Sequence, residues 1–258
     1  MWPSIEINLG SFTGQIHFYS VLMGCGLCHL FLGVDSASRS RGLNPNRTCN
    51  YYYCLGFAFI GGIIFSKVVT RLFYEGDTPW GNMAAMPGII GIAIVLFITA
   101  RMYRLPIRHY LELTVPFFCF AHAWGRLGCF MAGCCHGGPT DSIFGVQFPK
   151  NSPACMLHDC QPVHPTQLYE MAILILLGLL MQFIIPLGHR LYGYLMIYGI
   201  GRFAVEFFRG DDRGALGLIP VLSPSQLLCI SFILTGGGLA FWARKKPFPH
   251  AERAKSFE

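Results

Sequence analysis

The sequence predicts an all-α integral membrane protein with seven transmembrane helices. Three observations support this fold class. The chain of 258 residues is 53% hydrophobic and only 12% charged, with a mean hydropathy of +0.48, whereas a soluble domain carries about 25% charged residues. Its apolar residues form seven runs of the length that a helix needs to cross a bilayer. Its basic residues gather in alternate connections between these runs, as they do in the cytoplasmic loops of membrane proteins.

The seven predicted helices follow one another along the whole chain. Apolar residues lie on all sides of each segment, which distinguishes it from the one-sided pattern of a soluble amphipathic helix. No internal repeat divides the chain, so we predict one domain over residues 1–258. The expected spans are residues 16–34, 50–69, 83–100, 110–131, 165–185, 191–208 and 222–243.

The basic residues set the predicted orientation. Most of the 19 lysines and arginines lie in the connections after the first, third and fifth spans and in the tail after the last one. These segments are predicted to be cytoplasmic, which places the N-terminus outside and the C-terminus inside. The long connection at residues 137–164 then forms a small head on the outer, periplasmic side. Because topology accounts for the net charge of +6, this charge does not indicate a nucleic-acid partner.

Two arginines fall inside predicted spans, Arg126 in the fourth and Arg202 in the sixth. A charge at the centre of a bilayer costs about 2.5–3.5 kcal/mol on insertion scales, so such residues usually face the bundle interior and have a function. Helical spacing adds further polar side chains to the same helix faces. These faces carry His122, Arg126 and Cys129 in the fourth span and Arg202, Glu206 and Arg209 in the sixth.

These charged side chains have two interpretations. One is a buried ion-pair network that holds helices together, for example between Arg202 and Glu206. The other is an apolar cavity in which Arg126 and Arg202 bind a phosphate, because the guanidinium fork matches phosphate oxygens. In a membrane the abundant phosphate belongs to a lipid headgroup. We therefore expect a cavity that opens to the outer face and binds an anion.

Four sequence blocks resemble those of a known family. GRLGCFMAGCCHG (residues 125–137) is similar to the signature G-R-x-G-N-F-x-N-x-E-x-x-G of the bacterial prolipoprotein diacylglyceryl transferases. HPTQLYE (164–170), YGIGRFAVEFFRGDD (198–212) and, more weakly, LSPSQLL (222–228) resemble three further blocks in the same order. The resemblance implies seven spans, an outside N-terminus and a location in the bacterial inner membrane with the active site facing the periplasm.

The resemblance also implies a reaction. The family moves a diacylglyceryl group from phosphatidylglycerol to the cysteine thiol of a prolipoprotein. The thiolate attacks the glycerol carbon, a thioether forms and glycerol phosphate leaves. The implied partners are the phospholipid donor, the prolipoprotein or another thiol acceptor, and the membrane, and no cofactor is implied. Such chemistry needs groups that stabilise the leaving phosphate and help the thiol to lose its proton.

Candidate site residues follow from the matched positions. Arg126 and Arg202 would hold the phosphate, and Glu206 would orient the second arginine. Gly137 matches a glycine at which a close backbone approach is expected, and Tyr19 matches a functional tyrosine in the first span. The other substrate-binding candidates in matched blocks are His164, Gln167, Tyr169, Glu170 and Arg209.

The sequence departs from the family at its reactive positions. Cys129 and Cys134 replace an asparagine and the glutamate of the signature, and Ala132 replaces a second asparagine. Met86 stands where the family has a histidine, a candidate base. The chain thus keeps both arginines and changes the reactive groups. The further catalytic candidates are Cys129, Cys134, His122 and His136.

The cysteines have three interpretations, and their spacing does not decide between them. The first is a disulfide across the outer loop, since disulfides persist in an oxidising compartment. It would join Cys134 or Cys135 to Cys155 or Cys160. The second is a nucleophilic or redox thiol, because nearby cations lower a thiol pKa. It would be Cys129 or Cys134, activated by Arg126, His122 or His136.

The third interpretation of the cysteines is a metal site. The residue types suit zinc, although the spacing differs from the paired C-x2-C pattern of zinc sites, and we assign no metal ligand. The candidates would be Cys134, Cys135, His136, Cys155, His158 and Cys160.

Diacylglyceryl transfer is the preferred prediction of function. One alternative is a divergent homologue with thiol-based chemistry, redox or otherwise, on an outward-facing lipid or small anionic substrate. Another is a membrane protein without catalytic activity that binds a lipid or lipopeptide.

Overall fold

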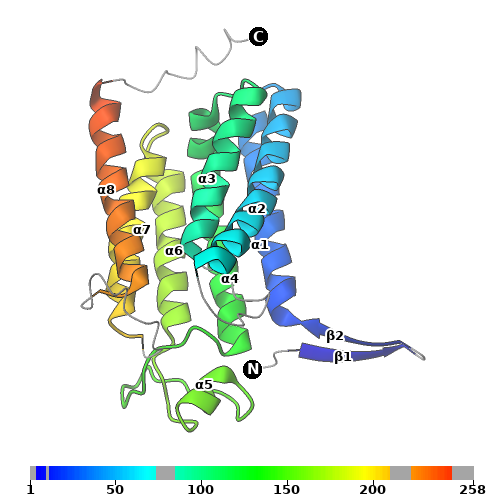
Figure 1. Cartoon of the computed structure of the whole chain (residues 1–258), viewed down its shortest axis with the longest axis vertical. Helices are drawn as coiled ribbons and strands as arrows, with labels where there is room; N and C mark the ends of the chain where they lie inside the picture. The colour runs from blue at the N-terminus through cyan, green and yellow to red at the C-terminus, as the bar shows by residue number, and fades with distance from the viewer. Residues whose placement is uncertain (1–3, 10–11, 74–84, 210–221, 246–258) are drawn as a thin grey trace. The chain divides into compact units, whose positions relative to one another are not determined.

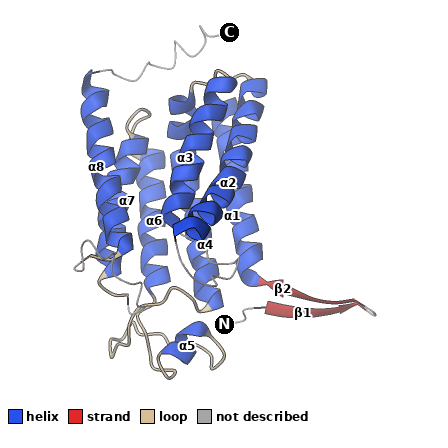
Figure 2. Ribbon diagram, in the orientation of Figure 1, coloured by secondary structure: helices blue, strands red, loops and turns tan. Residues whose placement is uncertain are grey.

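The computed structural model describes residues 4–9, 12–73, 85–209 and 222–245. These residues contain eight α-helices and a two-stranded hairpin (Figures 1 and 2). Seven of the helices are long, and each coincides with one predicted span. They are α1 (Phe18–Arg39), α2 (Pro45–Phe73), α3 (Ala85–Met102), α4 (Ile107–Ala132), α6 (Thr166–Phe183), α7 (Arg190–Glu206) and α8 (Pro224–Lys245). The eighth, α5 (Pro153–Leu157), is a short helix in the connection between α4 and α6.

The described chain is helical, as predicted for an all-α membrane protein, except for one hairpin at its N-terminus. Strand β1 (Ser4–Leu9) pairs antiparallel with β2 (Phe12–His17), in a register that places Ser4 opposite His17. The physical reason lies in the segment SIEINL, where polar and apolar residues alternate with the period of two that a strand requires. The first helix therefore begins at Phe18, and Ile16, which the prediction placed in the first span, lies in β2.

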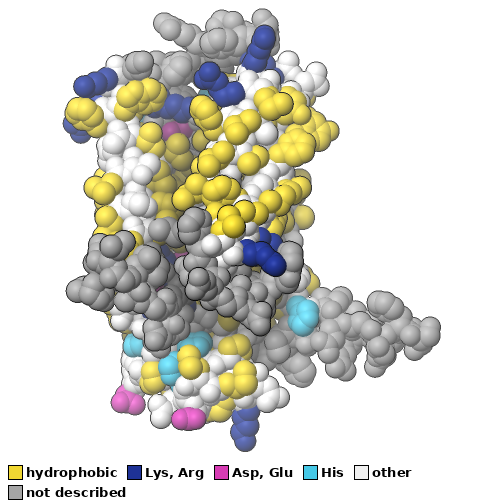
Figure 3. Space-filling view, in the orientation of Figure 1, with side chains coloured by type: hydrophobic (Ala, Val, Ile, Leu, Met, Phe, Trp, Pro, Cys, Tyr) yellow, Lys and Arg dark blue, Asp and Glu magenta, His cyan; other side chains and the backbone are white. Residues whose placement is uncertain are grey.

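The exposed surface of the helices is that of a membrane protein. In the part of the chain that the structure describes, four helices are long and apolar enough to cross a bilayer, and Pro87–Met102 is a shorter apolar one. These four are Phe18–Arg39, Pro45–Leu72, Thr166–Phe183 and Ser225–Lys245. Leu176 is 66% exposed and Leu234 70%, and Figure 3 shows apolar side chains spread over the helices. Soluble proteins rarely expose apolar surface on this scale. The count of seven spans stays a prediction.

The chain divides into two compact units. One contains the described residues up to Val34 and from Glu112 onward, and the other is Asp35–Leu111. In the second unit α2 packs on α3 through small residues, since a Cβ added at Gly62 would lie 2.9 Å from the Gly88 carbonyl oxygen. Small residues at such points let membrane helices approach closely. The prediction of one domain over the whole chain stays a prediction.

The core of the first unit combines residues of α4, α6 and α7. Its buried members are Val115, Cys119, Ala123, Leu174, Leu177, Met181, Tyr194 and Tyr198. A buried carboxylate helps to position α7, because Glu112 of α4 accepts hydrogen bonds from the backbone N–H groups of Gly188 (3.0 Å) and Arg190 (2.8 Å). It thereby satisfies N–H groups that the start of a helix leaves without an intrahelical partner. This packing brings the polar faces of the three helices together.

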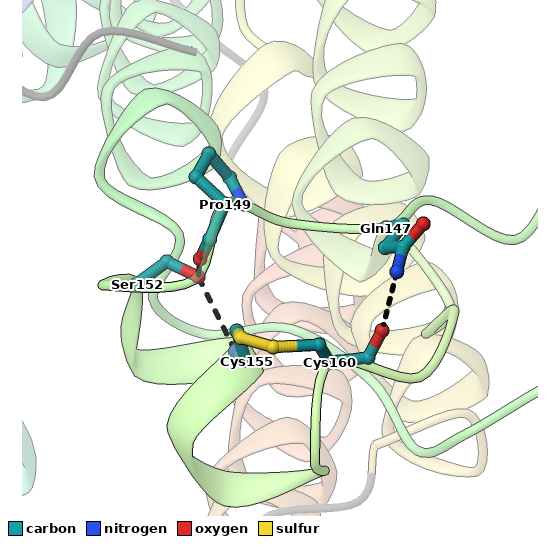
Figure 4. Close-up of a disulfide and its surroundings, with 5 residues drawn as sticks. All are labelled: Gln147, Pro149, Ser152, Cys155 and Cys160. Carbon is teal, nitrogen blue, oxygen red and sulfur yellow. Dashed lines mark hydrogen bonds between the residues drawn. A yellow bond between two sulfur atoms is a disulfide. The ribbon is translucent and has the colours of Figure 1, made fainter.

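The head (residues 137–164) contains α5 and a disulfide between Cys155 and Cys160 (Figure 4). The Ser152 hydroxyl accepts a hydrogen bond from the backbone N–H of Cys155 (3.2 Å) and caps α5. Gln147 Nε2 donates to the carbonyl oxygen of Cys160 (2.9 Å). Phe148, Ala154 and Val163 form a small core in this segment. The disulfide and these contacts give the head a defined structure.

The predicted disulfide between Cys134 or Cys135 and this segment is wrong. Cys155 pairs with Cys160, whereas Cys134 and Cys135 are free thiols. The physical reason is local. The chain turns tightly after α5, where the backbone N–H of Cys160 donates to the carbonyl oxygen of Cys155 (3.0 Å), so these two cysteines lie close together.

Candidate functional site

The two arginines of the predicted site meet at one carboxylate, that of Glu170. Arg126 of α4 places its Nη2 atom 2.9 Å from Glu170 Oε1, and Arg202 of α7 places its Nε atom 3.5 Å from Glu170 Oε2. The Glu170 side chain, in the second turn of α6, is only 1% exposed. Three helices thus each contribute one charged group to a single buried cluster. The sequence placed Glu170 among the substrate-binding candidates but did not predict this central position.

Tyr198 is a further member of the cluster that sequence reasoning missed. Its hydroxyl donates to Glu170 Oε1 at 2.7 Å, and His122 Nε2 lies 3.8 Å from the same oxygen. The rings of His122 and Tyr198 lie 5.5 Å apart between their centroids. Spacing alone could have found Tyr198, because it stands four residues before Arg202 and so shares its helix face.

Arg202 has a second acidic partner one helical turn further on. Its Nη1 atom lies 2.6 Å from Glu206 Oε2, and the hydroxyl of Ser223 donates to Glu206 Oε1 at 2.8 Å. The expected pairing of Arg202 with Glu206 is confirmed. Ser223 was not predicted, although it lies in the block LSPSQLL (222–228), directly before the first residue of α8. Arg202 is therefore held on two sides, by Glu170 and by Glu206.

The two arginines differ in access. The side chain of Arg126 is 19% exposed, against 8% for Arg202, and the buried Arg126 Nε has no hydrogen-bond partner among the described residues. A guanidinium carries five N–H donors in a fixed fork, so a single carboxylate cannot use all of them and some remain for another acceptor. The ion-pair network exists, and within it Arg126 is the more accessible cation for an anionic ligand.

Two of the cysteines are brought together by the way α4 ends. Gly133 has a φ of +69°, the left-handed conformation that ends many helices. Its N–H donates to the carbonyl oxygen of Phe130 (3.1 Å), and the N–H of Cys134 donates to that of Cys129 (3.1 Å). This is the pair of bonds of a Schellman motif, in which the side chains at the positions of Cys129 and Cys134 regularly touch. A glycine at position 133 is a recognisable sequence signal for the end of a helix, although it was not among the predictions from the sequence.

Cys135 completes a group of three thiols. It has a φ of +61°, which is uncommon for a residue other than glycine. The Sγ atoms of Cys129, Cys134 and Cys135 all lie within 4.8 Å of one another. Hydrogen bonds with the Cys129 and Cys134 thiols hold the pKa of the Cys135 thiol well below its ordinary value, and the Arg209 and Arg126 guanidiniums lower it further. Hydrogen bonds with Cys129 and Cys135 raise the pKa of the Cys134 thiol.

The block HPTQLYE anchors the turn that carries these thiols. Thr166 Oγ1 donates to the carbonyl oxygen of Cys135 (2.8 Å), and Gln167 Nε2 donates to that of Cys134 (2.6 Å). In the same block the His164 ring nitrogen Nδ1 lies 3.1 Å from the Tyr169 hydroxyl. The first turn of α6 therefore binds the backbone at the end of α4, and Glu170 follows in the next turn of the same helix. The contacts of Gln167 and Thr166 are structural.

Gly137 lies where two segments of backbone approach closely. Its N–H donates to the carbonyl oxygen of His164 (2.8 Å), and it forms an isolated bridge with Arg209. A Cβ at this position would collide with the carbonyl oxygen of Phe208 and would lie 2.6 Å from His164 Cβ. The close backbone approach that the sequence predicts for Gly137 is present, and it links the signature to the segment after α7.

We expect Gly137→Ala to lower the free energy of unfolding by about 1–3 kcal/mol, because the added methyl group forces backbone to move. Denaturation of the purified protein in detergent, followed by circular dichroism, measures this change. Gly237→Ala in α8 is the matched control, because an added Cβ there has no atom within 4 Å. If both variants unfold at the same denaturant concentration, the close approach at Gly137 is not a constraint.

The remaining candidates lie around the thiols. Tyr19 packs on Gly128, where an added Cβ would lie 3.0 Å from Tyr19 Cδ2, and it interacts electrostatically with the three cysteines. His136 is buried, with Nδ1 3.0 Å from the carbonyl oxygen of Gly137 and its ring 5.0 Å from that of His158. Met86 lies in the first turn of α3, and its side chain is outside the described part of the chain.

The metal-ligand set considered from the sequence needs correction. Cys155 and Cys160 are joined to each other, so they are not available as thiolate ligands. Among the described residues, the group of potential ligand atoms within 4.8 Å of one another consists of Cys129, Cys134 and Cys135. Cys129, which the predicted set omitted, takes part because the capping turn brings it beside Cys134.

Comparison with known proteins agrees with this arrangement. The family model for prolipoprotein diacylglyceryl transferase matches residues 5–242. The phosphatidylglycerol–prolipoprotein diacylglyceryl transferase of Clostridium tetani is 32% identical over 237 residues, which cover 86% of this chain and 91% of that protein. Phosphatidylglycerol–prolipoprotein diacylglyceryl transferase 2 of Clostridium perfringens is 32% identical over 258 residues, which cover 92% of this chain and 94% of that protein. The corresponding protein of a Marinomonas species is 29% identical over 278 aligned residues, which cover 98% of this chain and 99% of that protein. The chain therefore belongs to the prolipoprotein diacylglyceryl transferase family.

Proposed function

We propose that this protein transfers a diacylglyceryl group from phosphatidylglycerol to the cysteine thiol of a prolipoprotein. In this reaction the thiolate sulfur forms a bond to the glycerol carbon, the bond from that carbon to the phosphate oxygen breaks, and glycerol phosphate leaves with the electron pair. Family membership supports the proposal. The observation that carries it is the buried cluster in which Glu170 holds Arg126 and Arg202 side by side.

Arg126 is the residue that binds the phosphate most directly in this proposal. It is more exposed than Arg202 and has guanidinium donors beyond those used by Glu170. As negative charge develops on the leaving phosphate, a cation fixed in advance stabilises it without reorganisation. The positive charge of Arg202 also stabilises the leaving phosphate. Glu206 pairs with Arg202, and Ser223 binds Glu206, so Arg202 keeps its position.

The other candidates receive supporting roles. Tyr19 lies beside the three thiols and near Gly128, where it borders the site for the acceptor. His122 and Tyr198 orient Glu170. His164, Gln167, Tyr169 and Gly137 hold the ends of α4 and α6 together, and Arg209 and His136 lie on the backbone segments that meet there.

The site faces the periplasm in this proposal, in a protein that crosses the bacterial inner membrane seven times with its N-terminus outside. Two observations support this orientation. Most basic residues lie in the connections that it assigns to the cytoplasm. The head that follows the signature contains a disulfide, and disulfides persist in oxidising compartments. The relatives are bacterial proteins.

Complementation tests the proposed function. The chain is expressed in a bacterium depleted of its own prolipoprotein diacylglyceryl transferase, and the lipid on a reporter lipoprotein is measured by mass spectrometry. We expect a thioether-linked diacylglyceryl group on the reporter cysteine. If the protein reaches the membrane and the reporter stays unmodified, the proposed reaction is wrong. Purified protein in phosphatidylglycerol vesicles, assayed with a lipobox peptide, separates binding of lipid alone from transfer.

A further inference from the structure

Three free thiols meet at the end of α4, in the same unit as a formed disulfide. Cys155 and Cys160 are oxidised, whereas Cys129, Cys134 and Cys135 are free although their sulfur atoms lie within 4.8 Å of one another. Each of the three is partly buried, and the Cys134 thiol donates a hydrogen bond to the carbonyl oxygen of Cys129 (3.7 Å). Such a group of soft sulfur ligands matches the preference of zinc and related thiophilic metal ions.

The spacing of the sulfur atoms agrees with one shared ion. A zinc–sulfur distance of about 2.3 Å in tetrahedral geometry places two sulfur ligands about 3.8 Å apart. The three Sγ atoms already lie within 4.8 Å of one another, so small side-chain rotations bring them to that distance. Backbone movement is not needed, because the Schellman motif fixes Cys129 beside Cys134.

Hydrogen bonds fix the backbone of two of these cysteines, and metal sites need such contacts behind their ligands. Gln167 and Thr166 donate hydrogen bonds to the carbonyl oxygens of Cys134 and Cys135, and contacts behind the ligands keep metal sites in shape. Cys135 is kept in a left-handed conformation, with a φ of +61°. Residues other than glycine persist in such conformations where the surrounding structure enforces them, and they cluster at functional sites.

We propose that Cys129, Cys134 and Cys135 bind one Zn²⁺ ion and leave its fourth position open to the sulfur of the acceptor cysteine. Structural zinc sites have four protein ligands, whereas catalytic ones have three and an open position. Three ligand atoms form the group among the described residues. The open position rests on the proposed function, because that reaction supplies a thiol as the nucleophile.

The charges near the thiols suit this ion. One Zn²⁺ with three thiolates carries a net charge of about −1, and a fourth thiolate brings it to about −2. Arg126 and Arg209 both interact electrostatically with Cys135, so two cations offset this charge. Cys129 also stands three residues after Arg126 on α4 and shares its helix face. An acceptor sulfur on the ion thus lies on the face that carries the phosphate-binding arginine.

The proposed step is balanced. The acceptor thiol binds to Zn²⁺ and releases its proton to water, because a thiol that coordinates zinc is deprotonated. The sulfur then leaves the ion with its electron pair and bonds to the glycerol carbon of phosphatidylglycerol. The carbon–oxygen bond to the phosphate breaks, and glycerol phosphate departs with that electron pair. Water occupies the fourth position until the next acceptor binds.

Metal content tests the site without reference to activity. The full-length protein is purified in detergent after reduction with a phosphine, and zinc is measured by mass spectrometry with sulfur as the internal standard. We expect about one zinc ion per chain and a loss of at least about tenfold in the variant Cys129→Ser/Cys134→Ser/Cys135→Ser. Cys25→Ser/Cys28→Ser is the matched control, because these exposed thiols of α1 lie outside the group. Reduced wild-type protein that holds no zinc and takes up no Co²⁺ overturns the proposal.

Cobalt reports whether the fourth position accepts the substrate sulfur. Co²⁺ bound to thiolates shows a charge-transfer absorption that grows with the number of thiolates. Addition of a lipobox peptide to the Co²⁺-loaded protein is expected to raise this absorption about 1.3-fold, as three thiolates become four. The same peptide with serine in place of cysteine leaves it unchanged. An absorption that does not respond to the cysteine peptide overturns the open position.

Transfer assays separate this inference from the proposed function. The protein could bind zinc and cobalt, and its cobalt absorption could respond to the peptide, while it transfers no lipid. This result supports the metal site and contradicts the proposed diacylglyceryl transfer. Lipid transfer at the wild-type rate by the triple serine variant supports the reaction and overturns the role of the ion. The single variant Cys135→Ser repeats the test with a smaller change. We expect it to lose transfer activity, and neither added zinc nor added reductant is expected to restore that activity.

Discussion

Replacing Glu170 by glutamine is expected to lower the free energy of unfolding by about 3–5 kcal/mol, the usual cost of removing one partner of a buried ion pair. Glu170 is almost fully buried and bonds to Arg126, Arg202 and Tyr198 at the same time. The amide keeps the shape of the side chain but leaves the two guanidiniums with less negative charge between them. Because both arginines lose their orientation, transfer is expected to fall about 100-fold. Denaturation in detergent and the lipobox-peptide assay measure the two effects.

Asp35→Asn is the matched control for this change. It also converts an acid into its amide, but the ion pair of Asp35 with Arg39 is exposed, with 36% and 78% of the two side chains accessible. Exposed pairs contribute little to stability, so we expect a change within about 0.5 kcal/mol. Equal stabilities of Glu170→Gln and Asp35→Asn contradict the central role that we assign to Glu170.

Arg126→Lys is expected to lower the rate of transfer about 100- to 1,000-fold, the loss seen when one group that stabilises a developing anion is removed. Lysine keeps a positive charge opposite Glu170, so the fold is retained. It lacks the planar fork of donors that holds two oxygens of a phosphate at once. The initial rate in phosphatidylglycerol vesicles, with folding checked by circular dichroism, measures the effect.

Arg39→Lys is the control for Arg126→Lys, because its exposed side chain lies in a different unit from the site. We expect its rate to stay within about twofold of the wild-type rate. Arg202→Lys provides a second comparison. Arg202 is held by both Glu170 and Glu206, so its replacement is expected to reduce stability more than Arg126→Lys does. An Arg126→Lys protein with at least half of the wild-type rate rules out direct phosphate binding by the guanidinium.

The positions of the long helices could be predicted from the sequence. The fifth span was expected at residues 165–185, and α6 is Thr166–Phe183. The fourth was expected at 110–131, and α4 is Ile107–Ala132. Such agreement follows from a local cause, since a long apolar run in lipid satisfies its backbone groups within one helix. The hairpin at the N-terminus escaped prediction because residues 1–15 were assigned to no element, and only its last two residues, 16 and 17, fell in the first predicted span.

The cysteines show the opposite case. Their number and compartment suggested a disulfide to Cys134 or Cys135, but the pairing depends on which chain segments meet in space. The head folds so that Cys155 reaches Cys160, while the end of α4 is bound to α6 by Gln167 and Thr166. The one local clue, Gly133 as the residue that ends α4, concerns a single turn of backbone and was readable from the sequence.

The sequence by itself determined which residues become helices, that the chain belongs in a membrane, and which arginines and cysteines are candidates for the site. Each of these depends on hydropathy, helical spacing or a motif, all of which act over short stretches of chain. Only the tertiary structure decided that Glu170 joins the two arginines. Those contacts join side chains of α4, α6 and α7, which lie up to 76 residues apart between Arg126 and Arg202. They form because the buried charges have no water to satisfy them and are therefore stabilised by one another.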